Sequence, residues 1–342
     1  MKKKTTSCKN ILLTFDYELF FGKSGTLKKC ILEPVQELID FFEAHHIQAT
    51  FFVDILYYLC MVKNEPTSAD SRKIKEQLQL LVSKGHRIEL HLHPHWLDAD
   101  YHNNEWIFKD YRCYRLQNLP EEKIFELFQE GVKTLESIAR EVEPDYKVIA
   151  FRAGGFCIQP FEKLERAFIN CGLLVDSSVV PHMSGASNTH YYSFINAPEI
   201  EFYKFKQDPI IADSSGRFYE IPITTYRKRL SDKINIKFER IFRKSHFKIF
   251  GDGIGIWVKY SFWRKFIPTF EMLTLESTTP DLLIKNINRN KQRMINIISH
   301  PKNLSKNSFY ALERLSNNGF EFLNINQAID RIEKISDSTE LN

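Results

Sequence analysis

The sequence predicts an α/β fold of repeated strand–helix units, in which parallel strands form a sheet that is either open or closed into a barrel. Short apolar runs such as Asn10 to Phe15 and Ile47 to Val53 have the length of strands. Between them, the apolar residues from Leu32 to Phe42 recur at helical spacing. Strands that alternate with helices in this way imply parallel pairing through crossover helices.

The same alternation continues along most of the chain and breaks only between Val179 and Pro280. With 342 residues and 43% hydrophobic content, the chain can hold one large domain or two ordinary ones. From the repeated strand–helix units we expect a single domain over residues 1–342 with an irregular insertion at 180–280. Further helices are expected at 71–83, at 160–170 and from Pro120, Asp281, Ser305 and Gln327, and further strands at 87–92, 147–151, 173–175, 218–224, 294–298 and 320–323.

Ionisable side chains follow several of these strands at the point where each strand ends. In a parallel sheet the carboxyl ends of the strands lie at one edge, and ligands bind there. Five strands contribute, so a closed barrel would bring their ends together most directly. The residues concerned are Asp16, Glu18, His91, His95, Arg152, Asp176 and His300.

These residue types suit metal-assisted hydrolysis. A carboxylate and two imidazoles leave an open position on a divalent metal, where water becomes a strong nucleophile near neutral pH. A second carboxylate can accept a proton, and a histidine across the site can protonate a leaving group. A buried arginine or aspartate can orient the base and the acid. The sequence therefore predicts a divalent metal, with zinc as the first choice and cobalt or nickel as alternatives.

Charge and composition exclude several other classes of protein. The net charge of +4 is too small to predict nucleic-acid binding. The apolar run after Met1-Lys2-Lys3-Lys4 is interrupted by Asp16 and is too short for an export signal or a membrane span. The six cysteines show no CxxC spacing, which fits a reducing compartment. We therefore expect a cytoplasmic protein.

Several short motifs occur in a fixed order along the chain. They are Thr14-Phe15-Asp16, Ala49-Thr50-Phe51-Phe52, Gly85-His86, His91-x-x-x-His95, the Arg152 segment, Asp176-Ser177-Ser178 and Ile298-Ser299-His300. As an ordered set they resemble the polysaccharide deacetylase (NodB-homology) family, in the branch with Phe-Asp-Tyr-Glu and His-Leu-His-Pro-His motifs. The resemblance implies a distorted (β/α) barrel of about seven units and metal-dependent removal of acetyl groups from N-acetylated sugars.

The resemblance also implies a role for each residue that matches a motif. By position, Asp16 is the catalytic base, His91 and His95 are metal ligands, Arg152 tethers the base, and Asp176 orients the acid, His300. The family's second aspartate, a metal ligand, falls on Tyr17 in this chain. Its role passes to Glu18, to Asp16 or to no residue, and we favour Glu18 because its longer side chain can reach the metal.

Three further residues are candidates for contact with the substrate. Trp96 can stack on a sugar ring, although core packing is at least as good an explanation. His93 is either a third imidazole at the site or a structural residue. Phe156 belongs to Gly154-Gly155-Phe156, which stands where the family has a proline and a tyrosine. The sequence therefore does not identify which backbone N–H would donate to the oxyanion of the reaction.

The insertion contains a stretch with helical periodicity and basic charge. Residues 233–249 predict a basic amphipathic helix, which either rests on an anionic membrane surface or packs on the barrel as a solvated helix. Its basic residues are Lys233, Lys237, Arg240, Lys244 and Lys248, beside Ile234, Phe238, Ile241 and Ile249.

The favoured function is a carbohydrate N-deacetylase that acts on an N-acetylated glycan or a lipid-linked sugar, as a precursor of cell-surface polysaccharide. One alternative is an amidohydrolase of a small non-sugar amide. Another is a non-catalytic glycan-binding relative that lost activity with the second aspartate.

Overall fold

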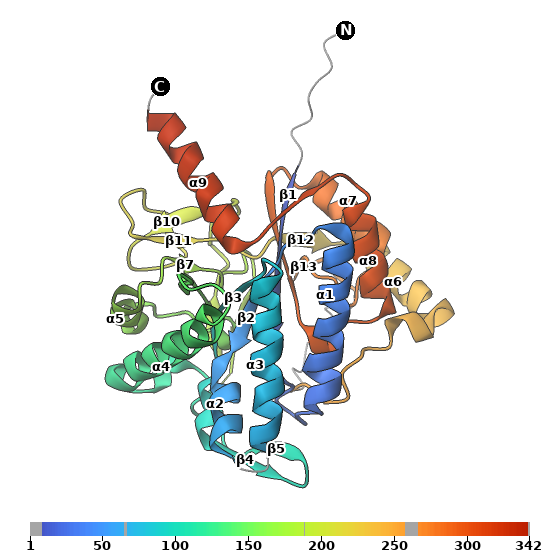
Figure 1. The fold of residues 1–342 in the computed structure, drawn as a ribbon. Helices are drawn as coiled ribbons and strands as arrows, with labels where there is room; N and C mark the ends of the chain where they lie inside the picture. The colour runs from blue at the N-terminus through green and yellow to red at the C-terminus, as the bar shows by residue number, and fades with distance from the viewer. Residues whose placement is uncertain (1–8, 65–66, 188, 257–265, 341–342) are drawn as a thin grey trace.

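The computed structural model describes residues 9–64, 67–187, 189–256 and 266–340. Its centre is a nine-stranded sheet in the order β10-β11-β7-β6-β3-β2-β1-β14, in which β15 also pairs with β1 (Figure 1). The pairing of β10 with β11 is antiparallel, and the other pairs described in this sheet are parallel. The strands are β1 (Asn10–Tyr17), β2 (Thr50–Asp54), β3 (Arg87–Leu92), β6 (Ala150–Ala153), β7 (Val175–Asp176), β10 (Tyr203–Phe205), β11 (Phe218–Glu220), β14 (Met294–Ser299) and β15 (Glu321–Leu323).

The sheet curls into a distorted barrel, and an irregular segment spans the gap between β11 and β14. After β11, the backbone N–H of Thr224 donates to the carbonyl oxygen of Asn296 at 3.0 Å. The N–H of Asn296 donates in return to Thr224 Oγ1 at 3.0 Å, and its side-chain amide donates to the Ile221 carbonyl at 3.1 Å. The predicted fold class, a distorted (β/α) barrel with parallel strands, is therefore confirmed.

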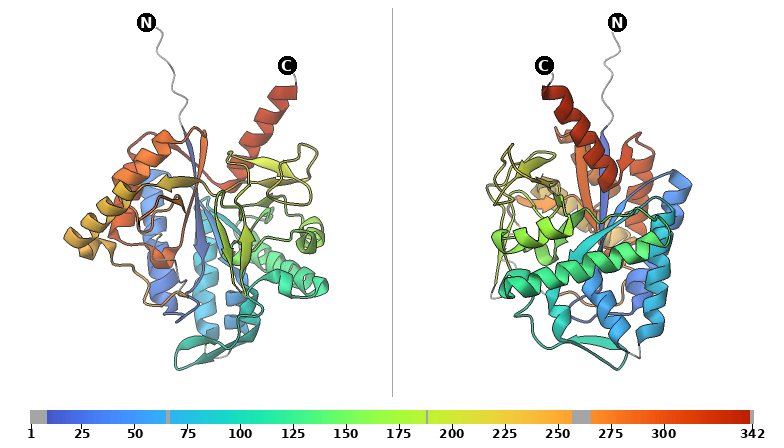
Figure 2. Two further views of the ribbon diagram at one scale, coloured as in Figure 1. Left: turned by 180° about the vertical axis from the view of Figure 1, so that it is seen from behind. Right: turned by 60° about the vertical axis from the view of Figure 1, so that its left-hand side comes forward.

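Helices cover the outer surface of the sheet, and α2, α3 and α4 all contact β3 (Figures 1 and 2). Among the residues that the structure describes, no helix combines the length and the apolar character needed to cross a bilayer. The helices are α1 (Glu33–His45), α2 (Ile55–Lys63), α3 (Ser68–Ser83), α4 (Glu121–Arg140), α5 (Glu162–Cys171), α6 (Leu230–Phe242), α7 (Pro280–Arg289), α8 (Lys306–Ser316) and α9 (Ile325–Glu340).

In the part of the chain that the structure describes, three small antiparallel ribbons lie outside this sheet. Residues 180–280, expected to be an irregular insertion, contain two of them together with β10, β11 and α6. The third ribbon and helix α2 were not expected from the sequence. The ribbons pair β4 (Ala99–His102) with β5 (Glu105–Phe108), β8 (Ser184–Ala186) with β9 (Tyr191–Ser193), and β12 (Thr225–Lys228) with β13 (Thr269–Met272).

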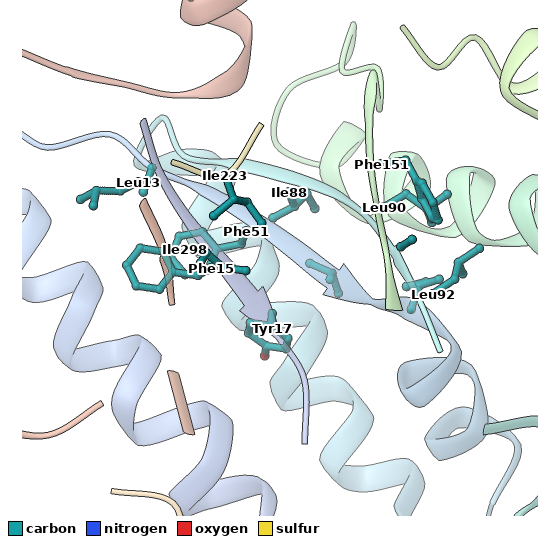
Figure 3. Packing of buried hydrophobic residues seen from close by; sticks show 14 of the residues in the cluster. Leu13, Phe15, Tyr17, Phe51, Ile88, Leu90, Leu92, Phe151, Ile223 and Ile298 are labelled. Atoms are coloured by element: carbon teal, nitrogen blue, oxygen red, sulfur yellow. The ribbon is translucent and has the colours of Figure 1, made fainter. Parts of the chain in front are cut away.

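Alternation along the strands separates an outer from an inner surface of the barrel. On the outer surface, Leu13, Phe15 and Tyr17 of β1 belong to the main hydrophobic core. Phe15 stacks on Phe51 of the neighbouring β2 with ring centroids 5.2 Å apart (Figure 3). This packing holds the sheet against its helices and leaves the even-numbered residues of β1 to face inward.

The inner surface carries an apolar cluster near the start of β1 and ionisable groups near its end. Leu12, Phe52 and Ile329 of α9 belong to a second buried cluster, and α9 lies at the end of the barrel where β1 starts (Figure 1). Further along β1, the same inward series continues with Thr14 and Asp16, which are also buried. An apolar cluster around α9 therefore packs near the start of β1, beside the buried ion pair of Arg87 and Glu89, and the groups of the candidate site gather toward the other end of the strand.

Candidate metal centre and active site

Inward side chains at the ends of β1 and β3 converge on Glu18. The Nε2 atoms of His91 and His93 lie 3.1 and 2.7 Å from Glu18 Oε2. One ligand atom from each of these three buried residues lies within 4.8 Å of the other two. Glu18 comes two residues after Asp16, and His93 comes two after His91, so strand alternation directs all of these side chains to the inner surface.

The hydrogen bonding of His91 prepares its Nε2 atom for a cation. Its Nδ1 atom lies 2.6 Å from the carbonyl oxygen of Arg152, which can only accept, so Nδ1 carries the hydrogen. The Nε2 atom then faces Glu18 Oε2 at 3.1 Å, and either a proton or a metal cation between the two atoms makes this contact favourable. Burial lowers the pKa of His91, but Asp16 and Glu18 outweigh it and raise the pKa. Glu18, His91 and His93 therefore fit a divalent metal such as zinc.

Asp16 is held by Arg152, which comes from β6. One guanidinium nitrogen donates to Asp16 Oδ1 at 2.7 Å, and both side chains are buried. The remaining donors of Arg152 bind Thr14 Oγ1 at 2.9 Å and the Ser177 carbonyl at 2.8 Å. Burial opposes ionisation of Asp16, but Arg152 and the nearby histidines hold the pKa of the carboxyl below its usual value. Asp16 is thus an ionised carboxylate in a fixed orientation.

His300 lies across the site from both carboxylates. Its Nε2 atom is 3.6 Å from Asp16 Oδ2 and 3.6 Å from Glu18 Oε1. Its Nδ1 atom is 2.8 Å from Oε1 of Glu276, which also accepts the backbone N–H of His300. Burial lowers the pKa of His300, but Glu276 and then the two carboxylates raise it to about 9. His300 is therefore protonated at neutral pH and can act as an acid.

Asp176, the predicted partner of His300, makes its contacts elsewhere. The neighbouring Ser177 hydroxyl reaches the inward-facing guanidinium, so strand alternation turns Asp176 toward the opposite side. There its carboxylate accepts a hydrogen bond from Ser178 Oγ at 2.6 Å. The residue that contacts the ring of His300 is Glu276, which the sequence analysis did not identify.

His95, predicted as a metal ligand, lies outside the cluster. Strand β3 ends at Leu92 and a 3₁₀ turn spans Pro94–Asp98, so the alternation that aligns His91 and His93 stops before His95. Its ring packs against Phe21 with centroids 4.5 Å apart. Neither of its ring nitrogens has a hydrogen-bond partner among the described residues. The second histidine of the cluster is thus His93, and not His95 as the family resemblance implies.

The other two candidates for substrate contact, Trp96 and Phe156, differ in how far they are buried. Trp96 is fully buried, and its indole N–H donates to Asp54 Oδ2 at 2.5 Å. As placed, its ring faces Tyr57 and Trp106 in the core, so it has no free face for a sugar. Phe156 is half-buried, and its edge contacts the ring of Tyr192.

Lys302 is a second residue that the sequence analysis missed. Its Nζ atom lies 2.8 Å from Glu18 Oε1 and 2.6 Å from the Leu19 carbonyl oxygen, and its side chain is buried. Burial opposes ionisation of Glu18, but Lys302 and then the histidines hold the pKa of Glu18 well below its usual value. The one signal in the sequence is Pro301, because a proline here begins the turn that carries Lys302 back to the site.

Gly154 permits the close approach of β6 to the cluster. A Cβ atom at this position would lie 2.5 Å from the Leu92 carbonyl oxygen and 2.7 Å from Nδ1 of His93. Both distances are shorter than van der Waals contact, so any side chain here would displace the His93 ring. The glycine that departs from the family's motif thus supports one of the candidate ligands.

Comparison with known proteins gives a result only at the level of structure. No family model matches the chain, and no curated protein matches its sequence. A protein from Mycobacterium smegmatis that is assigned as a polysaccharide deacetylase superposes with a TM-score of 0.50 and 14% identity, over 97% of this chain and 93% of that one. This chain has the polysaccharide deacetylase fold. The resemblance predicted from the motifs is thereby confirmed for the fold.

Other structures with the polysaccharide deacetylase fold are similar to smaller degrees. A peptidoglycan deacetylase from Bacillus subtilis gives a TM-score of 0.42 at 10% identity, over 98% of this chain and 96% of that one. A CE4 family pseudoenzyme from Bacillus anthracis gives a TM-score of 0.41 at 12% identity, over 93% of this chain and 64% of that one.

Proposed function

We propose that the protein is a metal-dependent hydrolase that removes N-acetyl groups from a carbohydrate. The observation that carries this proposal is the meeting of Glu18, His91 and His93 at one point. Beside them lie a carboxylate held by an arginine, Asp16, and an imidazole held by a carboxylate, His300. The polysaccharide deacetylase fold supports the same conclusion.

The chain supplies a group for each proton that amide hydrolysis must move. Glu18, His91 and His93 would hold the metal, which when bound lowers the pKa of a coordinated water and polarises a carbonyl oxygen. Asp16 keeps Oδ2 free of its bond to the arginine and accepts the proton of the attacking water. His300 donates the proton of its Nε2 atom to the departing amine, which leaves as a neutral product.

We further propose that the substrate is an N-acetylated glycan destined for the cell surface and that the protein works in the cytoplasm. The cysteines support this location, because disulfides are rare in reducing compartments. Within the described part of the chain, the free thiols are those of Cys30, Cys60, Cys113, Cys157 and Cys171.

The test is acetate release from N-acetylglucosamine oligomers by the full chain, loaded in turn with zinc, cobalt and nickel. We expect release that depends on metal and falls about 10³-fold in Asp16→Asn, which keeps the shape of the side chain but removes the base. Ammonia release from a small cyclic amide, without acetate release from the sugar, would instead identify the alternative amidohydrolase. If neither product forms with any of the metals, the enzymatic proposal is wrong.

A specific observation favours a second candidate, a glycan-binding protein without activity. The ammonium of Lys302 already neutralises Glu18, so this carboxylate has a cationic partner without a metal. Equilibrium dialysis with zinc followed by metal analysis separates the two candidates. Stoichiometric metal supports the hydrolase, whereas absence of metal together with calorimetric binding of the oligomer supports the second candidate.

A further inference from the structure

Helix α6 carries its apolar residues on the outside of the molecule. A surface helix normally directs its apolar stripe at the core. Along α6 the apolar positions recur at intervals of three and four, which places them on one stripe, yet this stripe faces solvent. Its exposed fractions are 42% for Leu230, 45% for Ile234, 56% for Phe238, 62% for Ile241 and 80% for Phe242.

The opposite side of α6 attaches the helix to the body. Asp232 and Ile236 are buried there, and Asp232 forms an ion pair with Lys285 of α7 at 3.2 Å. The ammonium of Lys233 donates to the Ile267 carbonyl oxygen at 2.8 Å. Figures 1 and 2 show α6 projecting from one side of the molecule. The other side of α6 is therefore already packed on the body of the molecule, and the exposed stripe is a second apolar side of the helix.

The surface around this stripe is strongly basic. Residues 229–248 contain seven lysines or arginines and two acids, a surplus of five positive charges. The whole chain has a net charge of +4, so the rest of it carries a net charge of about −1 at neutral pH. Of the two acids, Asp232 is paired with Lys285, and Glu239 lies 3.5 Å from Arg243. Within residues 229–248, both acids therefore have a cationic partner.

This combination of charge and apolar surface selects one kind of partner. A second copy of the chain would bring two surfaces of the same sign together, and their repulsion opposes self-association. A bilayer with anionic lipids matches both properties, because lysines and arginines attract its headgroups while apolar side chains enter the boundary with the acyl chains. We propose that α6 docks the protein on an anionic membrane surface, with Ile234, Phe238, Ile241 and Phe242 inserted.

The chain that follows α6 connects the proposed docking surface to the candidate active site. The backbone N–H of Gly251 donates to the Lys302 carbonyl oxygen at 3.0 Å, on the turn after His300. The N–H of Ile254 donates to the Lys23 carbonyl oxygen at 2.8 Å, in the loop that follows Glu18. If the proposed function is correct, this connection suits a substrate that is linked to lipid. The docking itself does not depend on catalysis.

The experiment is sedimentation of the full chain with vesicles at low salt. One set of vesicles contains phosphatidylcholine alone, and the other an equal mixture of phosphatidylcholine and phosphatidylglycerol. We expect binding to the mixed vesicles only, weakened by added salt. The apparent partition coefficient of the double variant Phe238→Ser/Phe242→Ser should be about tenfold or more lower. The matched control is Ile211→Ser, because Ile211 is 60% exposed and lies outside α6; it should bind like the unchanged protein.

Several results would overturn the proposal. They are failure of the unchanged protein to bind the anionic vesicles, equal binding to both kinds of vesicle, and full binding by a double variant whose circular dichroism is unchanged. Light scattering without vesicles provides one more test. If the unchanged protein forms a dimer and the double variant does not, the stripe binds a second copy of the chain and the proposal is wrong. Because the assay does not measure hydrolysis, its result is independent of acetate release.

Discussion

The two sides of the candidate site are built in different ways. The strand side comes from inward positions of neighbouring parallel strands and their first following residues, and consists of Asp16, Glu18, His91, His93 and Arg152. The turn side comes from irregular chain after β13 and β14, and consists of Glu276, His300 and Lys302. Sheet hydrogen bonds hold the strand side in place, whereas an isolated bridge, a few loop hydrogen bonds and side-chain contacts hold the turn side. We therefore expect substitutions on the strand side to abolish the site and those on the turn side to tune it.

The largest effect is expected for His93→Ala. Removal of a ligand should abolish stoichiometric zinc and reduce acetate release by about 10³-fold or more, as measured by metal analysis and the acetate assay. The matched control is His95→Phe, which keeps an aromatic ring between its neighbours and should retain the metal. If His95→Phe loses zinc while His93→Ala keeps it, the ligand set proposed from the structure is wrong.

Arg152→Met should have the next largest effect, on stability as well as activity. It leaves the Asp16 carboxylate buried without its partner, which costs about 3–5 kcal/mol in the free energy of unfolding. Urea denaturation measures this change. The control is Arg166→Met, because Arg166 pairs with Glu122 on the surface and its loss should cost less than about 1 kcal/mol. Equal destabilisation by the two variants would show that the buried pair does not hold the strand side.

A smaller effect is expected on the turn side, for Glu276→Gln. Burial lowers the pKa of His300, but Glu276 and the other carboxylates raise it to about 9, so removal of this charge should lower the pKa. The alkaline limb of the pH–rate profile should therefore move to lower pH. Because the folded pKa lies above the unfolded value of about 6.5, the protonated ring stabilises the fold fully below that pH. This stabilisation is lost as the pH rises through about 9.

The same measurement distinguishes Glu276 from Asp176. Asp176→Asn should leave the alkaline limb in place, because the Asp176 carboxylate bonds Ser178 and not the ring of His300. If the alkaline limb moves in Asp176→Asn but not in Glu276→Gln, Asp176 is the residue that orients His300, as the family resemblance implies.

The smallest effect is expected for Gly154→Ala. A methyl group here would lie 2.5 Å from the Leu92 carbonyl oxygen and 2.7 Å from His93 Nδ1, so the end of β3 and the His93 ring must shift, which should weaken zinc binding about tenfold in a competition titration. Gly255→Ala is the control, because the nearest atom to its new Cβ would be 3.9 Å away. Unchanged zinc affinity in Gly154→Ala would mean that His93 has room to move without cost.

The sequence predicted the strand side better than the turn side, and the reason is periodicity. Alternation along β3 is visible in the sequence and places His91 at the polar end of the strand, whereas Glu18 was favoured because its longer side chain can reach a metal. His95 and Asp176 received their roles from the family resemblance and not from periodicity. In the structure β3 ends at Leu92 and a turn follows, which places His95 outside the cluster. Asp176 lies in a strand of two residues and bonds Ser178.

Neither Glu276 nor Lys302 could be found by pattern. Glu276 lies 24 residues before His300 in irregular chain, and tertiary contacts such as the parallel bridge between Thr274 and Ile298 bring it to the site. Lys302 reaches Glu18 because of a short turn whose direction depends on tertiary contacts. The barrel fold was predictable because repeated strand–helix units determine it. Contacts between non-periodic segments depend on tertiary structure, which leaves no regular pattern in the sequence.

The loop after Glu18 limits how small molecules can enter. Phe21 covers the histidines, with its ring centroid 4.3 Å from that of His93. The side chain of His300 keeps 21% of its surface exposed, against 5% for Asp16 and 6% for Glu18. Of these three side chains, that of the proton donor is thus the most exposed to solvent, and we expect a small molecule to reach the carboxylates past His300. A chelator should then extract a bound ion slowly, and more slowly still while a sugar covers His300.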